Sequence, residues 1–384
     1  NTTAGVVTVN LPAATVGDIV GIKDYAGTFQ TYACTVAPNG SDNIGGGTAV
    51  DPTLAVEGES VLLVYADATQ GWLTTENSVT ASPTGAETFM VATGGTPCAG
   101  AISGDYKYHT FTGPGNFTVC SASPSAPNNV VSYMVVAGGG GGSGDGAGGG
   151  GAGGYREGKD PGDPYTASPL DATTTVPVSA SPGIYPIAVG AGGSAVTSPP
   201  WTINGGTGSV STFSTITSAG GGGGGNGCVT ANVQSSSGGG GRGSPGLAGT
   251  GNTPPASPAQ GTDGGNGRPG GSGGGGGATV AAADATGANG TAGGAGATTS
   301  INATPTARAG GGGGASGPGV NTGGAGGAGG GGRGPGPEPS SPGIAGTANT
   351  GGGGGGGQGG PHGPLGAIGF IGGSGTVIIR YKFQ

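Results

Sequence analysis

Runs of consecutive glycine residues constrain this chain more than any other feature. The chain has 104 glycines among its 384 residues, and many of them stand in uninterrupted runs. The longest runs are 138–142, 220–225, 273–277, 310–314 and 351–357. A glycine run has no side chains for chemistry, and glycine loses more backbone entropy on folding than any other residue. The runs therefore argue against an enzyme, and they need a physical reason to be ordered at all.

The glycines are distributed unevenly, which divides the chain into parts. Of the 104 glycines, 17 precede residue 138 and 87 follow. The first part has the composition of ordinary domains, whereas the second part cannot build a normal hydrophobic core. We expect residues 1–80 to form a β fibre module and residues 81–137 to form a second β unit. Residues 138–384 are expected to form a glycine-rich domain with variable loops and a closing strand at 376–383.

The charge pattern excludes several classes of partner. The formal net charge is −8, and the ten Lys and Arg residues are scattered singly. This excludes a basic nucleic-acid footprint and a polybasic membrane patch. No stretch approaches 18 consecutive apolar residues, so no membrane insertion is expected. The chain starts at Asn1 without a signal peptide, and it is either processed or the ordered part of a longer product. The second is favoured, because a strand is already under way near residue 6.

The cysteines and histidines do not form a recognisable metal or redox motif. Cys98 and Cys120 flank an expected hairpin and could form a disulfide, but isolated thiols are an equal alternative. His109 and His362 are far apart in the sequence. We therefore expect no metal site, no cofactor and no catalytic residue.

Short β-strands dominate the first 137 residues. Alternating or β-branched segments occur at 6–11, 18–23, 29–36 and 60–65, and a helical period is nearly absent. A small β-sandwich or barrel and an intertwined trimeric β-module both fit this first part. In the second β unit the candidate strands are 87–92, 105–111, 116–120 and 130–137.

Bundling explains how glycine runs can be ordered. In an extended conformation with three residues per turn, a chain makes no internal hydrogen bonds, so every N–H and C=O points outward. Without Cβ atoms, neighbouring segments can approach until these groups pair laterally. Strict Gly-X-Y periodicity is absent, which excludes collagen. A lattice of polyglycine II segments is the predicted result.

Such a lattice needs both of its ends held. We predict that strand 130–137, before the first run, lies beside strand 376–383, after the last run. An apolar flank is expected where the segments begin, formed by Tyr155, Tyr165, Tyr185, Trp201 and Phe213. The turns at the free end would be exposed, polar and variable, as binding loops on a rigid scaffold are. The predicted fold class is thus mainly β, with almost no α-helix: β modules, then packed polyglycine II helices closed by a C-terminal strand.

The non-glycine sequence segments between the runs resemble those of a known family. The chain is similar to the glycine-rich domain of bacteriophage tail-fibre and receptor-binding proteins, notably of marine phages, and its front part resembles the trimeric fibre modules of such proteins. In the glycine-rich domain the resemblance rests on segments 135–140, 153–157, 166–170, 185–193, 213–220 and 372–383. In the front part it rests on segments 11–13, 21–28 and 64–72.

The resemblance implies a virion-associated, extracellular fibre tip that acts as an adhesin. It implies a homotrimer, contacts with other tail-fibre or baseplate proteins, and a host-surface glycan or outer-membrane receptor. Candidate receptor contacts in the loops are Trp201, Tyr165, Arg156, Asn226 and Arg333. For Trp201 and Tyr165, packing within the apolar flank is an equal alternative.

Other functions have weaker sequence support. A structural subunit of a cellular extracellular filament or surface appendage would also use glycine segments, for assembly alone. A depolymerase would need paired carboxylates, and the closest pairs are Asp160 with Asp163 and Glu57 with Glu59. An ice-binding protein would need a flat face, which the long irregular loops would disturb.

Overall fold

The chain folds into two compact units, Asn1–Thr88 and Phe89–Gln384. We describe them from a computed structural model in which residues 2–45, 51–77, 89–197, 203–226, 235–243, 246–317, 322–336, 341–358 and 368–384 are described. The change of composition near residue 137 falls inside the second unit, because strands from both sides of it share one sheet. It is therefore not a boundary between compact units.

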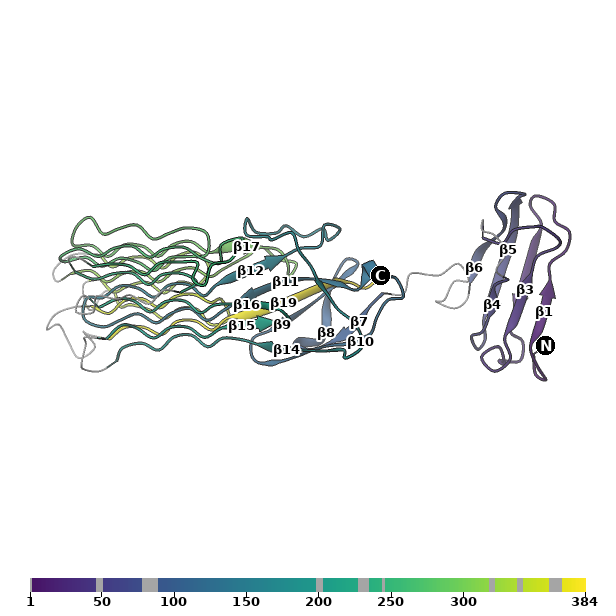
Figure 1. Cartoon of the computed structure of the whole chain (residues 1–384), viewed down its shortest axis with the longest axis horizontal. Coiled ribbons are helices and arrows are strands. Elements are labelled where there is room, and N and C mark those ends of the chain that lie inside the picture. The colour runs from purple at the N-terminus through teal and green to yellow at the C-terminus, as the bar shows by residue number, and fades with distance from the viewer. Residues whose placement is uncertain are drawn as a thin grey trace. The chain divides into compact units, whose positions relative to one another are not determined.

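The first unit is a pair of small sheets around one core. One sheet has the order β1-β3-β4 and the other β2-β5-β6, with β1 and β3 parallel (Figure 1). The buried residues between them include Leu54, Leu63 and Trp72. The strands are β1 Val7–Asn10, β2 Ile19–Lys23, β3 Cys34–Ala37, β4 Thr53–Leu54, β5 Ser60–Asp67 and β6 Gly71–Asn77.

The strand expected at 29–36 begins only at Cys34. The reason is Asp24, whose carboxylate accepts the backbone N–H groups of Thr28, Phe29 and Gly58 at 3.0–3.1 Å. These bonds hold residues 28–33 in turns and withdraw them from the sheet. Burial is the largest single effect on the pKa of Asp24 and raises it, but the backbone hydrogen bonds together outweigh burial and lower this pKa below its ordinary value.

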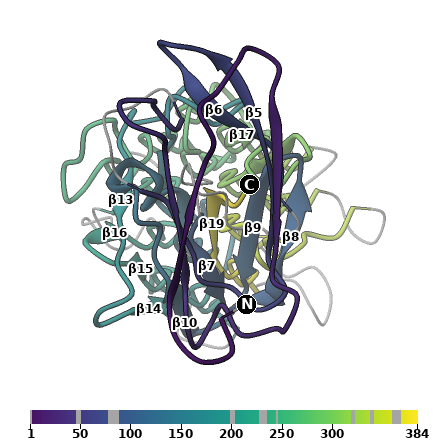
Figure 2. The same cartoon turned by 90° about the vertical axis from the view of Figure 1, so that its right-hand side faces the viewer.

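The second unit begins as two packed β-sheets. The sheet orders are β12-β11-β19-β9-β8 and β16-β15-β14-β10-β7, and Figure 2 shows β8, β9 and β19 on one side and β14, β15 and β16 on the other. The strands are β7 Val91–Thr93, β8 Thr96–Ser103, β9 Tyr106–Phe111, β10 Gly115–Ser121, β11 Val130–Val136, β12 Tyr155–Gly158, β14 Ile184–Ala188, β15 Ser211–Phe213, β16 Ile216–Ser218 and β19 Thr376–Lys382.

Short elements complete this unit. β13 (Val176–Pro177) pairs with β11, and β17 (Ala297–Thr299) forms a hairpin with β18 (Thr306–Arg308). The described residues include one 3₁₀ turn, Ala126–Asn128, and no α-helix. The mainly β prediction is confirmed. Within the described ranges, no helix has the length and apolar character needed to cross a bilayer.

The predicted closure of the glycine-rich domain is confirmed. β11 and β19 pair antiparallel, from Ser132 opposite Arg380 to Val136 opposite Thr376. Alternate residues of β19 face opposite sides of the sheet. Val377, Ile379 and Tyr381 enter the core between the two sheets, which also contains Phe117 and Phe213.

The other face of β19 carries a buried ion pair. Arg380 Nε lies 2.9 Å from Asp163 Oδ1 and 3.1 Å from Oδ2, and the Arg380 and Asp163 residues are only 2% and 1% exposed. Ser132 donates to the same carboxylate at 3.1 Å. The Arg380 guanidinium carbon also lies 4.9 Å from the centre of the Tyr106 ring and 5.6 Å from that of the Tyr165 ring. This pair ties the closing strand to the 159–175 loop.

Beyond the sheets, extended glycine-rich segments run side by side, as Figure 1 shows. We call each segment a rod and the whole set the glycine array. In rod 138–142, residues three apart donate to the same neighbour, and the three neighbours lie in different directions. The bonds are Gly138 to Ser209 and Gly141 to Gly206, Gly139 to Gly373 and Gly142 to Phe370, and Gly140 to Gly151.

The carbonyl groups of this rod bond to three further rods. They accept the N–H groups of Gly221 and Gly224, of Gly193 and Val196, and of Gly354. One rod thus has six hydrogen-bonded neighbours and a period of three residues, as expected for packed polyglycine II helices. Each bond contributes only about 0.5–1.5 kcal/mol, but nearly every backbone group in the rod makes one.

The close approach of the rods explains why they are glycine. A Cβ on Gly138, Gly140 or Gly142 would lie 2.0, 2.1 or 1.9 Å from a carbonyl oxygen of a neighbouring rod. Contacts this short are forbidden between backbone atoms and a methyl group. The absence of a side chain is therefore a packing requirement here, and it is independent of positive φ angles.

The buried His109 gives the second unit a predicted pH dependence. His109 is fully buried, one ring nitrogen lies 2.7 Å from the Gly94 carbonyl oxygen, and the ring stacks on Tyr381. Burial lowers the pKa of His109 below its ordinary value of 6.5, against the Gly94 bond. The unfolded chain therefore binds more protons as the pH falls below about 6.5.

We expect stability to be constant above that pH and to fall below it, by up to about 1.4 kcal/mol per pH unit. Urea unfolding of His109→Gln and of the unmodified chain between pH 4 and 8 measures this difference. An unchanged pH slope in the variant would show that other groups cause the acid sensitivity.

Candidate functional site

The turns between rods gather at two ends of the glycine array. At one end the rods join the β-sheets. At the other, which we call the distal end, the described turns include 143–147, 268–271 and 286–290. These turns lie close together: Ser272, next to turn 268–271, donates through Oγ to the Gly146 carbonyl, and a Cβ on Gly271 would lie 2.1 Å from the Gly287 carbonyl oxygen. The rods thus bring residues more than 100 positions apart together at the distal end.

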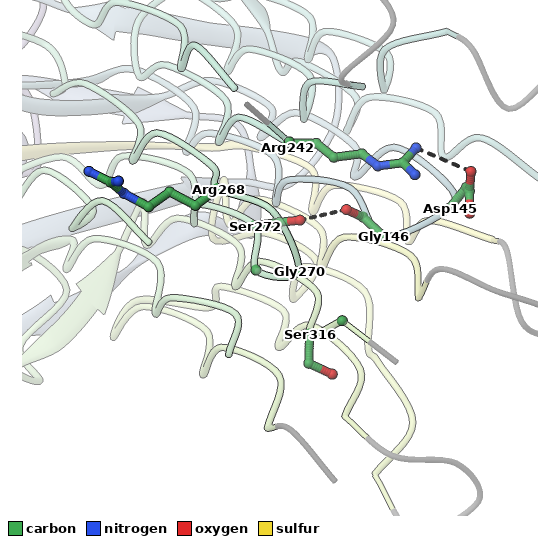
Figure 3. Close-up of a pocket in the computed structure, with 10 residues that line it drawn as sticks. Asp145, Gly146, Arg242, Arg268, Gly270, Ser272 and Ser316 are labelled. Atoms are coloured by element: carbon green, nitrogen blue, oxygen red, sulfur yellow. Dashed lines mark hydrogen bonds and ion pairs between the residues drawn. The ribbon is translucent and has the colours of Figure 1, made fainter. Parts of the chain in front are cut away.

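A pocket of about 270 Å³ opens among these distal turns. Figure 3 shows Asp145 and Arg242 facing each other at its rim, with Ser272 and Ser316 below them and the Arg268 side chain directed away from this pair. The lining residues are Asp145, Gly146, Arg242, Gly243, Arg268, Gly270, Gly271, Ser272, Ser316 and Gly317. The described lining consists of Asp, Arg, Ser and Gly residues and contains no aromatic or aliphatic residue.

The pocket wall depends on residues in the left-handed conformation. Asp145 has φ 58°, Gly146 has φ 69°, Gly243 has φ 74° and Gly270 has φ 89°. Glycine adopts such angles without strain, and Asp is among the few other residues that tolerate them. These four residues therefore shape the turns that line the pocket.

One ion pair holds the charged rim. Asp145 Oδ2 lies 3.2 Å from Arg242 Nη1, and the two side chains are 34% and 28% exposed. An ion pair with side chains about one-third exposed adds little to stability. It does fix a hydrogen-bond acceptor and a donor next to each other at the mouth of the pocket.

Two receptor-contact candidates from the sequence, Tyr165 and Asn226, have buried side chains in this structure. Tyr165 is 6% exposed and packs with Met134, Tyr155 and Ile378 behind the sheet, as an apolar flank residue. Asn226 is 2% exposed, and its backbone N–H donates to Asn204 Oδ1 at 2.9 Å.

The other candidates have different outcomes. Arg156 belongs to β12, opposite Val135, and so it lies in a sheet strand and not in a loop as expected. Arg333 is partly exposed, and its Nε donates to the Pro342 carbonyl at 2.9 Å. Trp201 lies outside the described residues. The carboxylate pairs considered for a depolymerase each have one member with a structural partner. Asp163 forms an ion pair with Arg380, and Glu59 accepts a hydrogen bond from the Val56 N–H.

The predicted apolar flank forms, but on two sides of one sheet. Tyr155 and Tyr165 belong to the cluster behind the sheet, and Tyr185 and Phe213 belong to the core between the sheets. Both groups lie where rods meet strands.

The disulfide alternative for Cys98 and Cys120 is wrong in this structure, because both are free and exposed thiols. β8 carries Cys98 and pairs with β9, whereas β10 carries Cys120 and pairs with β7 and β14, so the two residues stand in different sheets. We predict that a maleimide labels Cys98 and Cys120 without reduction and leaves the buried Cys34 unlabelled in the native state. Peptide mapping by mass spectrometry measures this, and a linked Cys98–Cys120 peptide would contradict it.

The described residues contain no group of three or more His, Cys, Asp or Glu side chains that could hold a metal ion. The distal pocket is a candidate site for a ligand, because it lies among the exposed turns at the end of the array. Its residues Asp145, Arg242 and Arg268 were not identified from the sequence. A sequence pattern that could have identified them is a single charged residue flanked by two glycines, or by a glycine and a proline.

A protein-family model matches most of the second unit. The family model described as a glycine-rich domain matches residues 112–382, from just after β9 to the last residue of β19. A comparison with curated proteins gave no match. Since the matched segment covers more than half of the chain, the chain belongs to the glycine-rich domain family.

Proposed function

We propose that this protein is the tip of a virion tail fibre and that it attaches the particle to a host-cell surface through the distal turns. The observation that carries the proposal is the collection of these turns at one end of a hydrogen-bonded rod array. Loops fixed on a rigid scaffold lose little entropy on binding, which favours affinity without any catalytic group.

Two further features support attachment. The distal pocket has exposed, charged and polar groups held in one geometry, as a recognition surface requires. A separate small β unit precedes the glycine-rich unit, in keeping with the resemblance of its sequence to fibre modules.

Assembly as a homotrimer on other tail-fibre or baseplate proteins is part of the proposal. Three copies that each bind weakly gain avidity through effective concentration, on the order of 10²–10⁴-fold. The receptor is proposed to be a surface glycan or an outer-membrane protein, and the location is extracellular, on the virion.

Immunogold electron microscopy tests this function. Antibodies to the purified chain are expected to label the ends of phage tail fibres in lysates, and native mass spectrometry of the full chain is expected to give a trimer. Labelling of open-ended cellular filaments without phage particles would overturn the proposal in favour of a filament subunit.

A further inference from the structure

We propose that the distal pocket binds one uncharged sugar unit of a surface polysaccharide, with Asp145 and Arg242 as the paired hydrogen-bonding groups. This inference rests on the proposed attachment function and adds the chemical class of the ligand. It is drawn from the composition, charge balance and size of the pocket.

The lining excludes apolar and aromatic ligands. Its side chains are those of Asp, Arg and Ser, and the rest of the described wall is glycine backbone. Apolar ligands gain affinity from hydrophobic and aromatic walls, which this pocket lacks. A ligand here must instead exchange hydrogen bonds with the carboxylate and guanidinium groups.

The paired charges at the rim disfavour ionic ligands. Asp145 and Arg242 neutralise each other at 3.2 Å. Arg268 also lines the pocket, but its side chain points away from this pair. Its charge helps to lower the pKa of Asp284, which the Asn266 N–H and side-chain bonds lower most. An anion entering the rim would meet the Asp145 carboxylate, and a cation would meet Arg242.

Neighbouring hydroxyl groups of a sugar ring match this rim. A hydroxyl both donates and accepts, so adjacent hydroxyls can donate to the carboxylate while accepting from the guanidinium beside it. Both bonds are charge-assisted, which makes them stronger than neutral ones. The Ser316 hydroxyl is buried and donates to the Pro335 carbonyl, so the Asp145–Arg242 pair supplies the side-chain hydrogen bonds at the rim.

The dimensions favour one ring over a peptide. The volume of about 270 Å³ is below the range of roughly 300–1,000 Å³ for pockets that enclose drug-sized ligands. An extended peptide would add to an unpaired row of backbone groups. Here the Arg268 and Gly271 N–H groups already bond to each other's carbonyl oxygens, at 2.9 and 3.1 Å.

Binding of the full chain to an array of neutral, carboxylated and sulfated oligosaccharides tests the inference. We expect neutral members to bind, and Asp145→Asn and Arg242→Gln each to weaken that binding about tenfold or more, as expected for loss of a hydrogen bond to a charged group. Asn tolerates the left-handed angle of Asp145, so the turn is retained. Asp105→Asn, an exposed carboxylate in the β8–β9 hairpin, is the matched control and should bind normally.

Attachment to a panel of bacterial strains, with and without periodate oxidation of their glycans, separates the two proposals. Attachment that resists periodate but is lost after protease treatment of the cells would overturn the sugar site and leave the adhesin proposal standing. Preference for sulfated or carboxylated members, equal binding by the variants, or no glycan binding would overturn the sugar site as well. If the chain bound glycans but attached to no bacterial strain, and if its antibodies labelled no phage particle, the adhesin proposal alone would be overturned.

Discussion

Replacing Gly140 by alanine is expected to prevent folding of the glycine-rich unit or to destabilise it by about 3 kcal/mol or more. The new Cβ would lie 2.1 Å from the Gly222 carbonyl oxygen and 2.5 Å from its carbon. Since both contacts are to backbone, no side chain can rotate to relieve them. Separating the rods would instead break lateral hydrogen bonds, including Gly140 N–H to Gly151. Thermal and urea unfolding of the purified variant measure the loss.

Gly287→Ala is the matched control for this prediction. A Cβ on Gly287 would meet nothing within 4 Å, and this glycine has no left-handed φ. The same substitution should therefore change stability by no more than about 1 kcal/mol, with stabilisation expected because alanine restricts the unfolded chain. Equal effects of the two substitutions would show that glycine is not required by rod packing.

Replacing Arg380 by methionine is expected to cost about 3–5 kcal/mol, because it leaves the Asp163 carboxylate buried without its partner. Burial already raises the pKa of Asp163, and the hydrogen bond and charge of Arg380 oppose that rise. Without Arg380 the carboxylate would take up a proton more readily in the folded state. Urea unfolding at pH 7 measures the destabilisation.

Two further variants identify the cause. The double variant Arg380→Met with Asp163→Leu should recover much of the loss, because no charge remains buried. Lys107→Met removes a cation from the adjacent strand, where its Nζ lies over the Phe383 ring, and it should cost about 1 kcal/mol at most. If the double variant is as unstable as Arg380→Met, the loss comes from packing and not from the unpaired carboxylate.

Local sequence patterns were sufficient to predict the parts of the fold that depend on backbone chemistry. The pairing of β11 with β19 followed from strands flanking the first and last glycine runs, and the lateral bonding followed from the missing Cβ atoms. β8 was not predicted, because its residues Thr96–Ser103 include Pro97 and Gly100, which are both uncommon inside strands. The Arg380–Asp163 pair joins residues 217 positions apart, and no local pattern indicates it.

The site was harder to predict because rods reverse direction many times. Which turn reaches which end depends on the path of every preceding rod, so Asp145, Arg242 and Ser316 could not be grouped from sequence. Tyr165 and Asn226 were chosen as polar or aromatic loop residues, yet the sheet covers Tyr165 and the array buries Asn226. Residue type alone does not give exposure when the surrounding backbone is this closely packed.

Amide hydrogen exchange of the glycine runs, followed by mass spectrometry, tests the central claim most directly. In rods such as 138–142, 309–316 and 353–357 the N–H groups donate to neighbouring rods, although these segments belong to no helix or strand. We predict exchange as slow as that of β11 and β19, since opening one rod requires breaking bonds to several neighbours. Exchange within seconds, as in a flexible glycine linker, would contradict the hydrogen-bonded array.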